Sequence, residues 1–302
     1  MILKTMLFGK TYQFRSVKEV LAKANEEKSG DKLAGVAAES SEERIAAKVV
    51  LAQLTLEDLF NHPVVDYDED EVTRIIVDQV NLKIFDSIKH WTVEELREWI
   101  LSDKTGDFDI KRISRGLTAE MIAAVCKLMS NMDLIVGAKK IKIQKTANTT
   151  IGKTGTFSAR LQPNHPTDNV DGIMASVMEG LSYGVGDAVI GLNPVDDSTE
   201  SVVRILNKFE EFRSEWDIPT QTCVLAHVTT QMEAIRQGAP TGLVFQSIAG
   251  SEKGNTAFGI SGGLIQEARD LVLQQGQAVG PNVMYFETGP VSYTHLTLPT
   301  IL

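Results

Sequence analysis

The second half of the chain alternates short apolar runs with amphipathic segments, and this order limits the available folds more than any other feature. From about residue 145 onward, each apolar run has the length of a strand and is rich in branched or aromatic side chains. Amphipathic helical segments separate most of these runs. Alternating strands and helices predict a parallel sheet. The predicted strands are 156–164, 187–194, 220–228, 242–250 and 282–289, and the predicted helices are 169–184, 198–216, 229–238 and 260–278.

Polar residues followed by turn signals end nearly every predicted strand. An apolar strand needs no such residue for stability, whereas β/α barrels build their active sites at the carboxyl ends of their strands. A doubly wound sheet would instead gather these residues at one switch point. We therefore predict an α/β fold with an incomplete TIM-type (β/α) barrel, about five of its eight strands being present. The alternative is that polar residues simply mark strand exits into solvent. The strand-end residues are Arg160, Gln162, Asn193, His227, Gln246, Ser247 and Glu287.

The first part of the chain has the periodicity of helices. Thr92 stands three residues before Glu95, which is the spacing of a capping box. The acidic stretch 67–71 is interpreted as a solvated loop or a helix start, because five consecutive positions cannot all face one metal ion. We predict a mainly helical region over 1–145, followed by the partial barrel over 146–290. The helices expected in the first region are 16–30, 40–54, 92–101 and 118–135.

Composition narrows the class of protein. The 302 residues are 43% hydrophobic and 23% charged, which is enough for a sizeable core in one large or two ordinary domains. A net charge of -10 argues against nucleic acid as a partner. No apolar run reaches the roughly 20 residues that span a bilayer, and the first residues make a poor secretory signal. The two cysteines, Cys126 and Cys223, have no metal-ligand spacing, so we predict a reduced cytoplasmic location and no metal site.

The last residues break the pattern. Helical periodicity stops after Gly289, and VSYTHLTLPT back-translates to a sequence that resembles a transposon end from a sequencing library. We therefore predict that residues 291–302 are an artefact; the alternative is a genuine Thr-rich terminal strand. Five strands do not close an eight-stranded barrel. The chain is thus expected to be a C-terminally truncated fragment.

Residues 147–154 fit the loose pattern of a phosphate-binding loop that ends with Lys153 and Thr154. Such a loop wraps backbone N–H groups round a phosphate between a buried strand and a helix. Here the preceding segment is too charged for a central strand, and the following one is itself predicted to be a strand. A nucleotide-binding protein using Lys153 is therefore the weaker interpretation.

Four strand-end residues suggest a chemistry. Arg160 and Gln162 are two apart in a strand, so both can face the barrel interior. Asn193 offers a donor and an acceptor, and Glu287 can pair with an ammonium group or accept from a hydroxyl. The set suits a small, polar, cationic substrate. It contains no evident nucleophile, so the reactive group would come from a cofactor.

A cysteine–histidine nucleophilic pair is excluded within the predicted strand 220–228. Cys223 and His227 share a face of that strand but lie about 13 Å apart at ~3.3 Å per residue. His165 stands in the loop after strand 156–164. The roles of His165 and His227 are left open.

Several long segments resemble the large subunit of the ethanolamine ammonia-lyase family. They include LAGVAAESSEERIAAK, KTANTTIGKTGTFSARLQPN, GDAVIGLNPV, TGLVFQSIAGSEKG and YFETG, and the likeness extends over nearly the whole chain up to Gly289. The resemblance implies a helical N-terminal region followed by a β/α barrel. It also implies a carbon–nitrogen lyase that converts ethanolamine to acetaldehyde and ammonia with adenosylcobalamin, the cobalt-containing coenzyme B12.

The resemblance implies roles for the same four residues. Arg160 and Asn193 would hold the substrate hydroxyl, and Gln162 would bind the amino group. Glu287 would touch both and take part in catalysis during migration of the amino group. Hydrogen would first be abstracted from the carbinol carbon by a radical from the cofactor, and later returned before ammonia is lost.

The resemblance also implies a cofactor site and partners. Pro194 and Gln246 match positions that line the cobalamin, and Ser247 lies beside them. The partners would be a small subunit and further copies in a hetero-oligomer, in the cytoplasm or in a bacterial microcompartment. The family's barrel has three further strands that carry another substrate carboxylate and more corrin contacts. This fragment is therefore expected to be inactive alone; the remaining alternative is a noncatalytic assembly protein that binds cobalamin or the small subunit.

Overall fold

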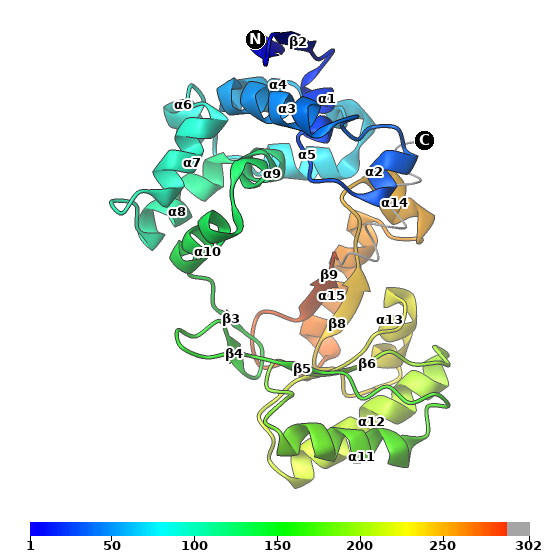
Figure 1. Ribbon diagram of the computed structural model, residues 1–302. Coiled ribbons are helices and arrows are strands. Elements are labelled where there is room, and N and C mark those ends of the chain that lie inside the picture. Colours follow the sequence, from blue (N-terminus) through cyan, green and yellow to red (C-terminus); the bar gives the residue numbers. More distant parts are fainter. Residues whose placement is uncertain (289–302) are drawn as a thin grey trace. The chain divides into compact units, whose positions relative to one another are not determined.

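The computed structural model of the chain describes residues 1–288, so the predicted artefact at 291–302 lies outside the described residues. The fold is a mixed α/β fold with small sheets (Figure 1). Its described residues form two compact units. The first consists of Met1–Lys142 with Ala249–Gly254, and the second consists of Ile143–Ile248 with the described residues from Asn255 onward. None of the helices within 1–288 is both long and apolar enough to cross a membrane.

The first unit opens with an antiparallel hairpin that the sequence did not predict, in which Thr5 pairs with Tyr12. Helices follow, and most begin at a side chain that accepts a backbone N–H. The elements are β1 (Lys4–Leu7), β2 (Lys10–Gln13), α1 (Val17–Lys23), α2 (Ser29–Leu33), α3 (Ser41–Gln53), α4 (Leu56–Asn61), η1 (Tyr67–Glu69), α5 (Glu71–Asp78), α6 (Leu82–Ile88), α7 (Val93–Leu101), α8 (Asp107–Ile113), η2 (Ser114–Gly116), α9 (Ala119–Leu128) and α10 (Asn131–Lys140).

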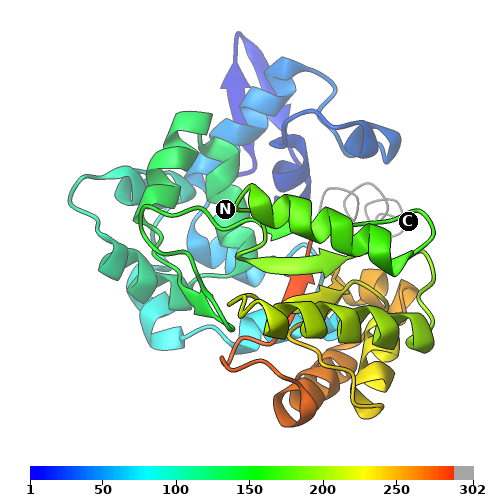
Figure 2. The same cartoon turned by 90° about the horizontal axis from the view of Figure 1, so that it is seen from below.

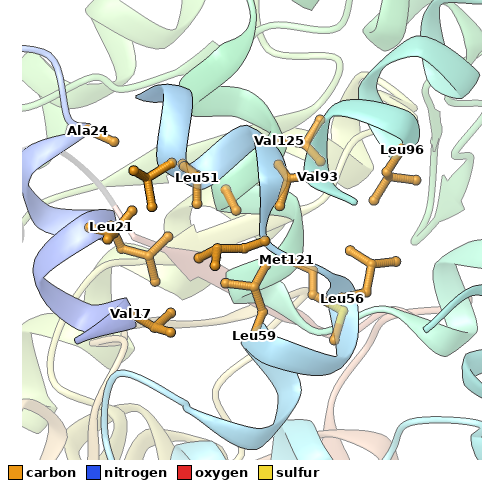
Figure 3. Packing of buried hydrophobic residues seen from close by; sticks show 14 of the residues in the cluster. Val17, Leu21, Ala24, Leu51, Leu56, Leu59, Val93, Leu96, Met121 and Val125 are labelled. Carbon is orange, nitrogen blue, oxygen red and sulfur yellow. The ribbon is translucent and has the colours of Figure 1, made fainter. Parts of the chain in front are cut away.

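A shared core buries apolar side chains of α1, α3, α4, α6, α7 and α9 (Figure 3). On α3 the buried residues Ala46, Ala47, Val50 and Leu51 recur at helical spacing. Burying a side chain the size of Leu or Met contributes about 1.5–3 kcal/mol. The core is therefore the main source of stability in this unit. Its largest fully buried members include Leu51, Leu54, Leu56, Leu59, Leu96 and Met121.

Two helix predictions in this unit were wrong in extent. Segment 118–135 forms two helices. The first ends at Leu128, and Ser130 caps the second: its Oγ accepts from the N–H of Asp133 at 3.2 Å, and Asp133 Oδ2 accepts from the N–H of Ser130 at 3.0 Å. Segment 16–30 also divides, into α1 and the start of α2. The capping box at Thr92 is confirmed.

The acidic stretch 67–71 does begin a helix. Asp70 is almost fully buried and caps α5, since its Oδ2 accepts from the N–H of Thr73 at 2.8 Å and from the hydroxyl of the same residue at 3.0 Å. A carboxylate at this end of a helix also meets the positive end of the helix dipole. The interpretation of this stretch as a helix start is confirmed.

The second unit contains each of the five predicted strands, all paired in parallel. One sheet has the order β5-β6-β7 and another pairs β8 with β9. The hydrogen bond from Leu243 N to Thr222 O, 3.0 Å long, links β7 to the residue before β8. The described strands do not close into a barrel. The elements that follow Lys142 along the chain are β3 (Lys145–Thr146), β4 (Thr150–Ile151), β5 (Arg160–Leu161), α11 (Val170–Ser182), β6 (Val189–Leu192), α12 (Thr199–Glu215), β7 (Thr222–Val224), α13 (Val228–Arg236), β8 (Val244–Ser247), α14 (Glu252–Ala257), α15 (Gly262–Gln275) and β9 (Met284–Glu287), and α14 begins in the segment that belongs to the first unit.

The two faces of the strands are covered differently. Helices α11 and α12 both lie on the same side of β5 and β6 (Figures 1 and 2), where Ile190, Leu192 and Val224 pack against them. The opposite face carries a second apolar cluster that includes Val189, Cys223, Leu243, Phe245 and Tyr285. Successive side chains of a strand point to opposite faces, so the odd-numbered residues of β6, β7, β8 and β9 share this second face. We call it the inner face.

Candidate active site

Polar residues close to the carboxyl ends of the strands extend the inner face. Gly191 shows the direction, because a Cβ added there would lie 3.2 Å from Leu225 Cδ1 and 3.9 Å from Arg160 Cδ. Arg160 therefore crosses this face next to β6. At the far side, Ser247 and Glu287 are in register on the paired strands β8 and β9. The inner face thus carries polar side chains near the carboxyl ends of its strands, next to its apolar cluster.

Arg160 is the centre of that set. Its Nη1 donates to the hydroxyl of Tyr285 at 2.6 Å, and its Nη2 donates to Gln162 Oε1. Glu287 Oε2 lies 3.9 Å from the same Nη1. Three of the predicted residues, Arg160, Gln162 and Glu287, are therefore together, although they come from β5, the residue after it, and β9.

The Arg160–Glu287 pair is held apart. A separation of 3.9 Å is longer than a hydrogen bond, so neither charged group satisfies the other. The side chains of Arg160 and Glu287 are 30% and 45% exposed, and an ion pair this exposed contributes little to stability. The arrangement places a cation and an anion side by side at an accessible edge. Together they suit a ligand that has one group to accept from Arg160 and another to donate to Glu287.

Asn193 and Pro194 lie in a loop that the preceding strand–helix loop holds by its side chains. Asn164 Oδ1 accepts from the N–H of Asn193 at 2.9 Å. Asp168 Oδ2 then accepts from the N–H groups of Val195 and Asp196, at 2.8 and 2.7 Å. Pro194 has no N–H, so side chains of the previous loop bind every backbone donor from 193 to 196. Asn193 and Pro194 are therefore presented from a fixed backbone.

Asp168 is an unusual residue for a loop. It is only 4% exposed, has a positive φ of 49°, and its Oδ1 is buried with no hydrogen-bond partner among the described atoms. The sequence analysis missed both Asn164 and Asp168. The signal was the run of loop residues that combine an amide, a carboxylate and prolines after β5, since Asn and Asp tolerate positive φ and bind nearby backbone groups.

Gln246 faces away from the inner face. It is 7% exposed, and its Oε1 accepts from the N–H of Val228, the first residue of α13, at 3.0 Å. Its Nε2 donates to the carbonyl of Ser247 at 3.0 Å. A glutamine amide has two donors and two lone pairs, so these two bonds leave one of each for a ligand. Ser247 itself is half-buried and lies in register with Glu287.

The two histidines left open by the sequence both serve the backbone. His227 caps α13, and its Nδ1 accepts from the N–H of Thr229 at 3.3 Å, while its Nε2 lies 3.0 Å from the carbonyl of Phe258 and donates to it. His165 Nδ1 accepts from the N–H groups of Thr167 and Asn169, both at 3.3 Å. These hydrogen bonds give both histidines a structural role in their loops.

No reactive thiol lies in the described part of this site. Cys223 is fully buried in the inner cluster, and burial raises the pKa of its thiol far above the usual range. A nucleophile must reach its thiolate form, so this residue packs and does not react.

The phosphate-loop interpretation of Lys153 has no structural support. Residues 147–149 form the turn of the antiparallel hairpin between β3 and β4, and the N–H groups of Asn148 and Thr149 donate to Gln221 Oε1 at 3.0 and 3.1 Å. The next helix after Lys153 is α11, which begins at Val170. The helix N-terminus that such a loop requires is absent from its place.

Comparison with known proteins decides the family. The sequence profile described as "Ethanolamine ammonia lyase large subunit (EutB)" matches residues 12–296. The chain belongs to the ethanolamine ammonia-lyase large-subunit family. It is 57% identical over 289 residues to the "Ethanolamine ammonia-lyase large subunit" of Escherichia coli K12, and 56% identical over the same length to that of Salmonella typhimurium LT2. Each alignment covers 96% of this chain and 64% of the relative, so the chain spans under two thirds of the length of these large subunits.

Proposed function

We propose that the chain is part of the large subunit of an adenosylcobalamin-dependent ethanolamine ammonia-lyase, which deaminates ethanolamine to acetaldehyde and ammonia. Membership of the ethanolamine ammonia-lyase large-subunit family supports this assignment. The structural observation that carries it is the meeting of Arg160, Gln162 and Glu287 at one edge of the inner face. These side chains come from opposite ends of the strand succession, and the core of the unit does not need them.

The donors and acceptors of this site match an amino alcohol. A guanidinium only donates and an ionised carboxylate only accepts. Arg160 thus binds the substrate hydroxyl oxygen, together with the amide of Asn193. Glu287 accepts from both the hydroxyl and the ammonium group and is the residue that assists migration of the amino group. Gln162, whose Oε1 has a second lone pair beyond its bond with Arg160, binds the amino group.

The chain's own residues leave the radical chemistry to a cofactor. Adenosylcobalamin, when bound, would supply the radical chemistry that none of these side chains can provide. Pro194 and Ser247, both half-buried at the strand ends, suit the flank of a large ring. Gln246, which faces away from the inner face, would contact the ring only if its side chain turned. The residues of the site hold charge and geometry around the reacting atoms.

The remaining parts of the proposal concern architecture and partners. The succession of parallel strands separated by helices fits part of a (β/α) barrel over 146–290, after a helical region over 1–145. A small subunit and further copies complete a hetero-oligomer in the cytoplasm or a microcompartment. The chain spans 64% of the length of the E. coli large subunit, so its assays use a chain of the relative's full length.

A substitution at Glu287 tests the proposed function. Residues 1–288 are joined to the remaining sequence of the E. coli large subunit and produced with the small subunit. The Glu287→Gln change keeps the size of the side chain and removes its charge. Losing a charge-assisted contact worth about 3 kcal/mol lowers kcat/KM for ethanolamine roughly 10²-fold.

Glu267→Gln is the matched control, because Glu267 is an exposed acid on α15 that pairs only with Arg236 among the contacts found. Its kcat/KM is expected to stay within about twofold of the parent, as exposed pairs contribute little. Full turnover by the Glu287→Gln enzyme, or a parent enzyme that binds cobalamin and never releases ammonia, would refute the proposal. The second result would indicate a noncatalytic binding protein.

A further inference from the structure

Tyr285 makes a close hydrogen bond with Arg160, and neither the sequence nor the family name draws attention to it. Its hydroxyl oxygen accepts from Nη1 at 2.6 Å. Its ring lies under the guanidinium, with Cζ 5.9 Å from the ring centroid. The ring is fixed in turn by Phe245, whose centroid is 5.4 Å away. The tyrosine is thus a rigid, neutral acceptor anchored in the inner apolar cluster.

We propose that Tyr285 is a positioning residue that keeps Arg160 aimed at the substrate and away from Glu287; the inference rests on the proposed function. Tyr285 and Glu287 compete for one atom. Both approach Nη1, the hydroxyl at 2.6 Å and the carboxylate at 3.9 Å. The hydroxyl takes the hydrogen bond without neutralising the charge, so the ion pair stays open.

Gln162 binds the other terminal nitrogen of the Arg160 guanidinium. It accepts from Nη2, so two neutral oxygens hold the plane of the guanidinium. Such a planar group gives its full directional benefit only when its plane is fixed. Without Tyr285, the long side chain of Arg160 is able to turn onto Glu287 and form a closed ion pair. That pair would occupy both groups that grip the amino alcohol.

The Tyr285→Phe change removes only the hydroxyl oxygen and keeps the ring. We expect the dissociation constant for ethanolamine, measured by calorimetry on the assembled chimaeric enzyme without cobalamin, to rise about tenfold, as for the loss of one hydrogen bond to a charged group. KM rises in parallel, whereas kcat falls less than about threefold, because substrate has first to break the closed pair and then reacts normally. Tyr183→Phe, at an exposed tyrosine after α11, is the matched control and changes neither constant.

A double-mutant cycle with Arg160→Lys separates positioning from packing. Lysine has no fork to orient, so Tyr285→Phe is expected to add less than about twofold in that background. If Tyr285→Phe raised the dissociation constant equally in both backgrounds, or not at all in the parent, the proposal for Tyr285 would be wrong. The proposed function would still hold as long as the parent enzyme deaminates ethanolamine. A parent that binds ethanolamine but does not deaminate it would sink the proposed function alone. A parent that binds no ethanolamine would sink both.

Discussion

Replacing Asp168 tests whether the loop after β5 holds the loop that carries Asn193 and Pro194. Asp168 accepts two backbone N–H groups at 2.8 and 2.7 Å, and hydrogen bonds to a charged acceptor are each worth about 1.5–3 kcal/mol. The Asp168→Ala change loses both, and alanine at a φ of 49° adds about 1–2 kcal/mol of strain. Water can reach exposed Val195, so we expect a net local destabilisation of roughly 2–4 kcal/mol.

Asp168→Asn is the informative partner variant. Asparagine tolerates positive φ, keeps one oxygen for the two N–H groups, and puts its NH₂ where Oδ1 has no partner among the described atoms. Its expected cost is about 1 kcal/mol. Amide exchange at Val195 and Asp196, followed by NMR, measures both, since each ~1.4 kcal/mol lowers protection tenfold.

Protection in the Asp168→Ala chain is thus expected to fall about 30- to 10³-fold, against roughly fivefold for Asp168→Asn. Asp171→Asn, at an exposed position in the first turn of α11, serves as control and leaves both amides unchanged. Unaltered exchange in the Asp168→Ala chain would show that the carboxylate does not hold the loop, and the reasoning would fail.

Three further predictions concern buried and paired groups. Because burial raises the pKa of the Cys223 thiol, a thiol reagent should modify exposed Cys126 alone in the native chain and both cysteines in urea; two reactive thiols without urea would contradict this. Gln221→Leu should cost about 2–5 kcal/mol in urea unfolding, since it strands two N–H groups that donate to this fully buried amide; an unchanged midpoint would contradict the account. The hydrogen bond from Arg213 lowers the pKa of Glu210 below its usual value, so the stabilisation by this pair is present above the usual pKa and is lost as the pH falls through the lowered pKa. Arg213→Met should therefore cost about 0.5 kcal/mol near neutral pH and progressively less as the pH falls through the lowered pKa of Glu210, and a cost that does not change with pH would refute the linkage.

The sequence predicted the strands of the second unit because their burial pattern is local. Each apolar run could be found without knowing its neighbours, and each contains a strand. The lengths could not be found this way. Segment 156–164 has only Arg160–Leu161 in ladder pairing, since the extent of pairing depends on where β6 lies. The order of the parallel strands was thus predictable from the sequence, and the number of residues paired in each strand was not.

Residues that act through other residues were the ones missed. Tyr285 looked like an ordinary core aromatic, because its contact with Arg160 joins positions 125 apart in the chain. Asp168 looked like a solvated loop acid, because its partners are backbone groups of another loop. By contrast, the break at Ser130 was readable, since the acid three residues later completes a capping box. A closer search for caps would have divided that helix.

The central claim is that one amino alcohol bridges Arg160 and Glu287. The most direct test is a crystal structure of the chimaeric large subunit, produced with the E. coli small subunit and grown with saturating ethanolamine. We predict density for a two-carbon ligand between these residues, with its oxygen within hydrogen-bond distance of Arg160 and its nitrogen near Glu287 and Gln162. A closed Arg160–Glu287 ion pair without ligand, or ethanolamine bound elsewhere, would contradict the account.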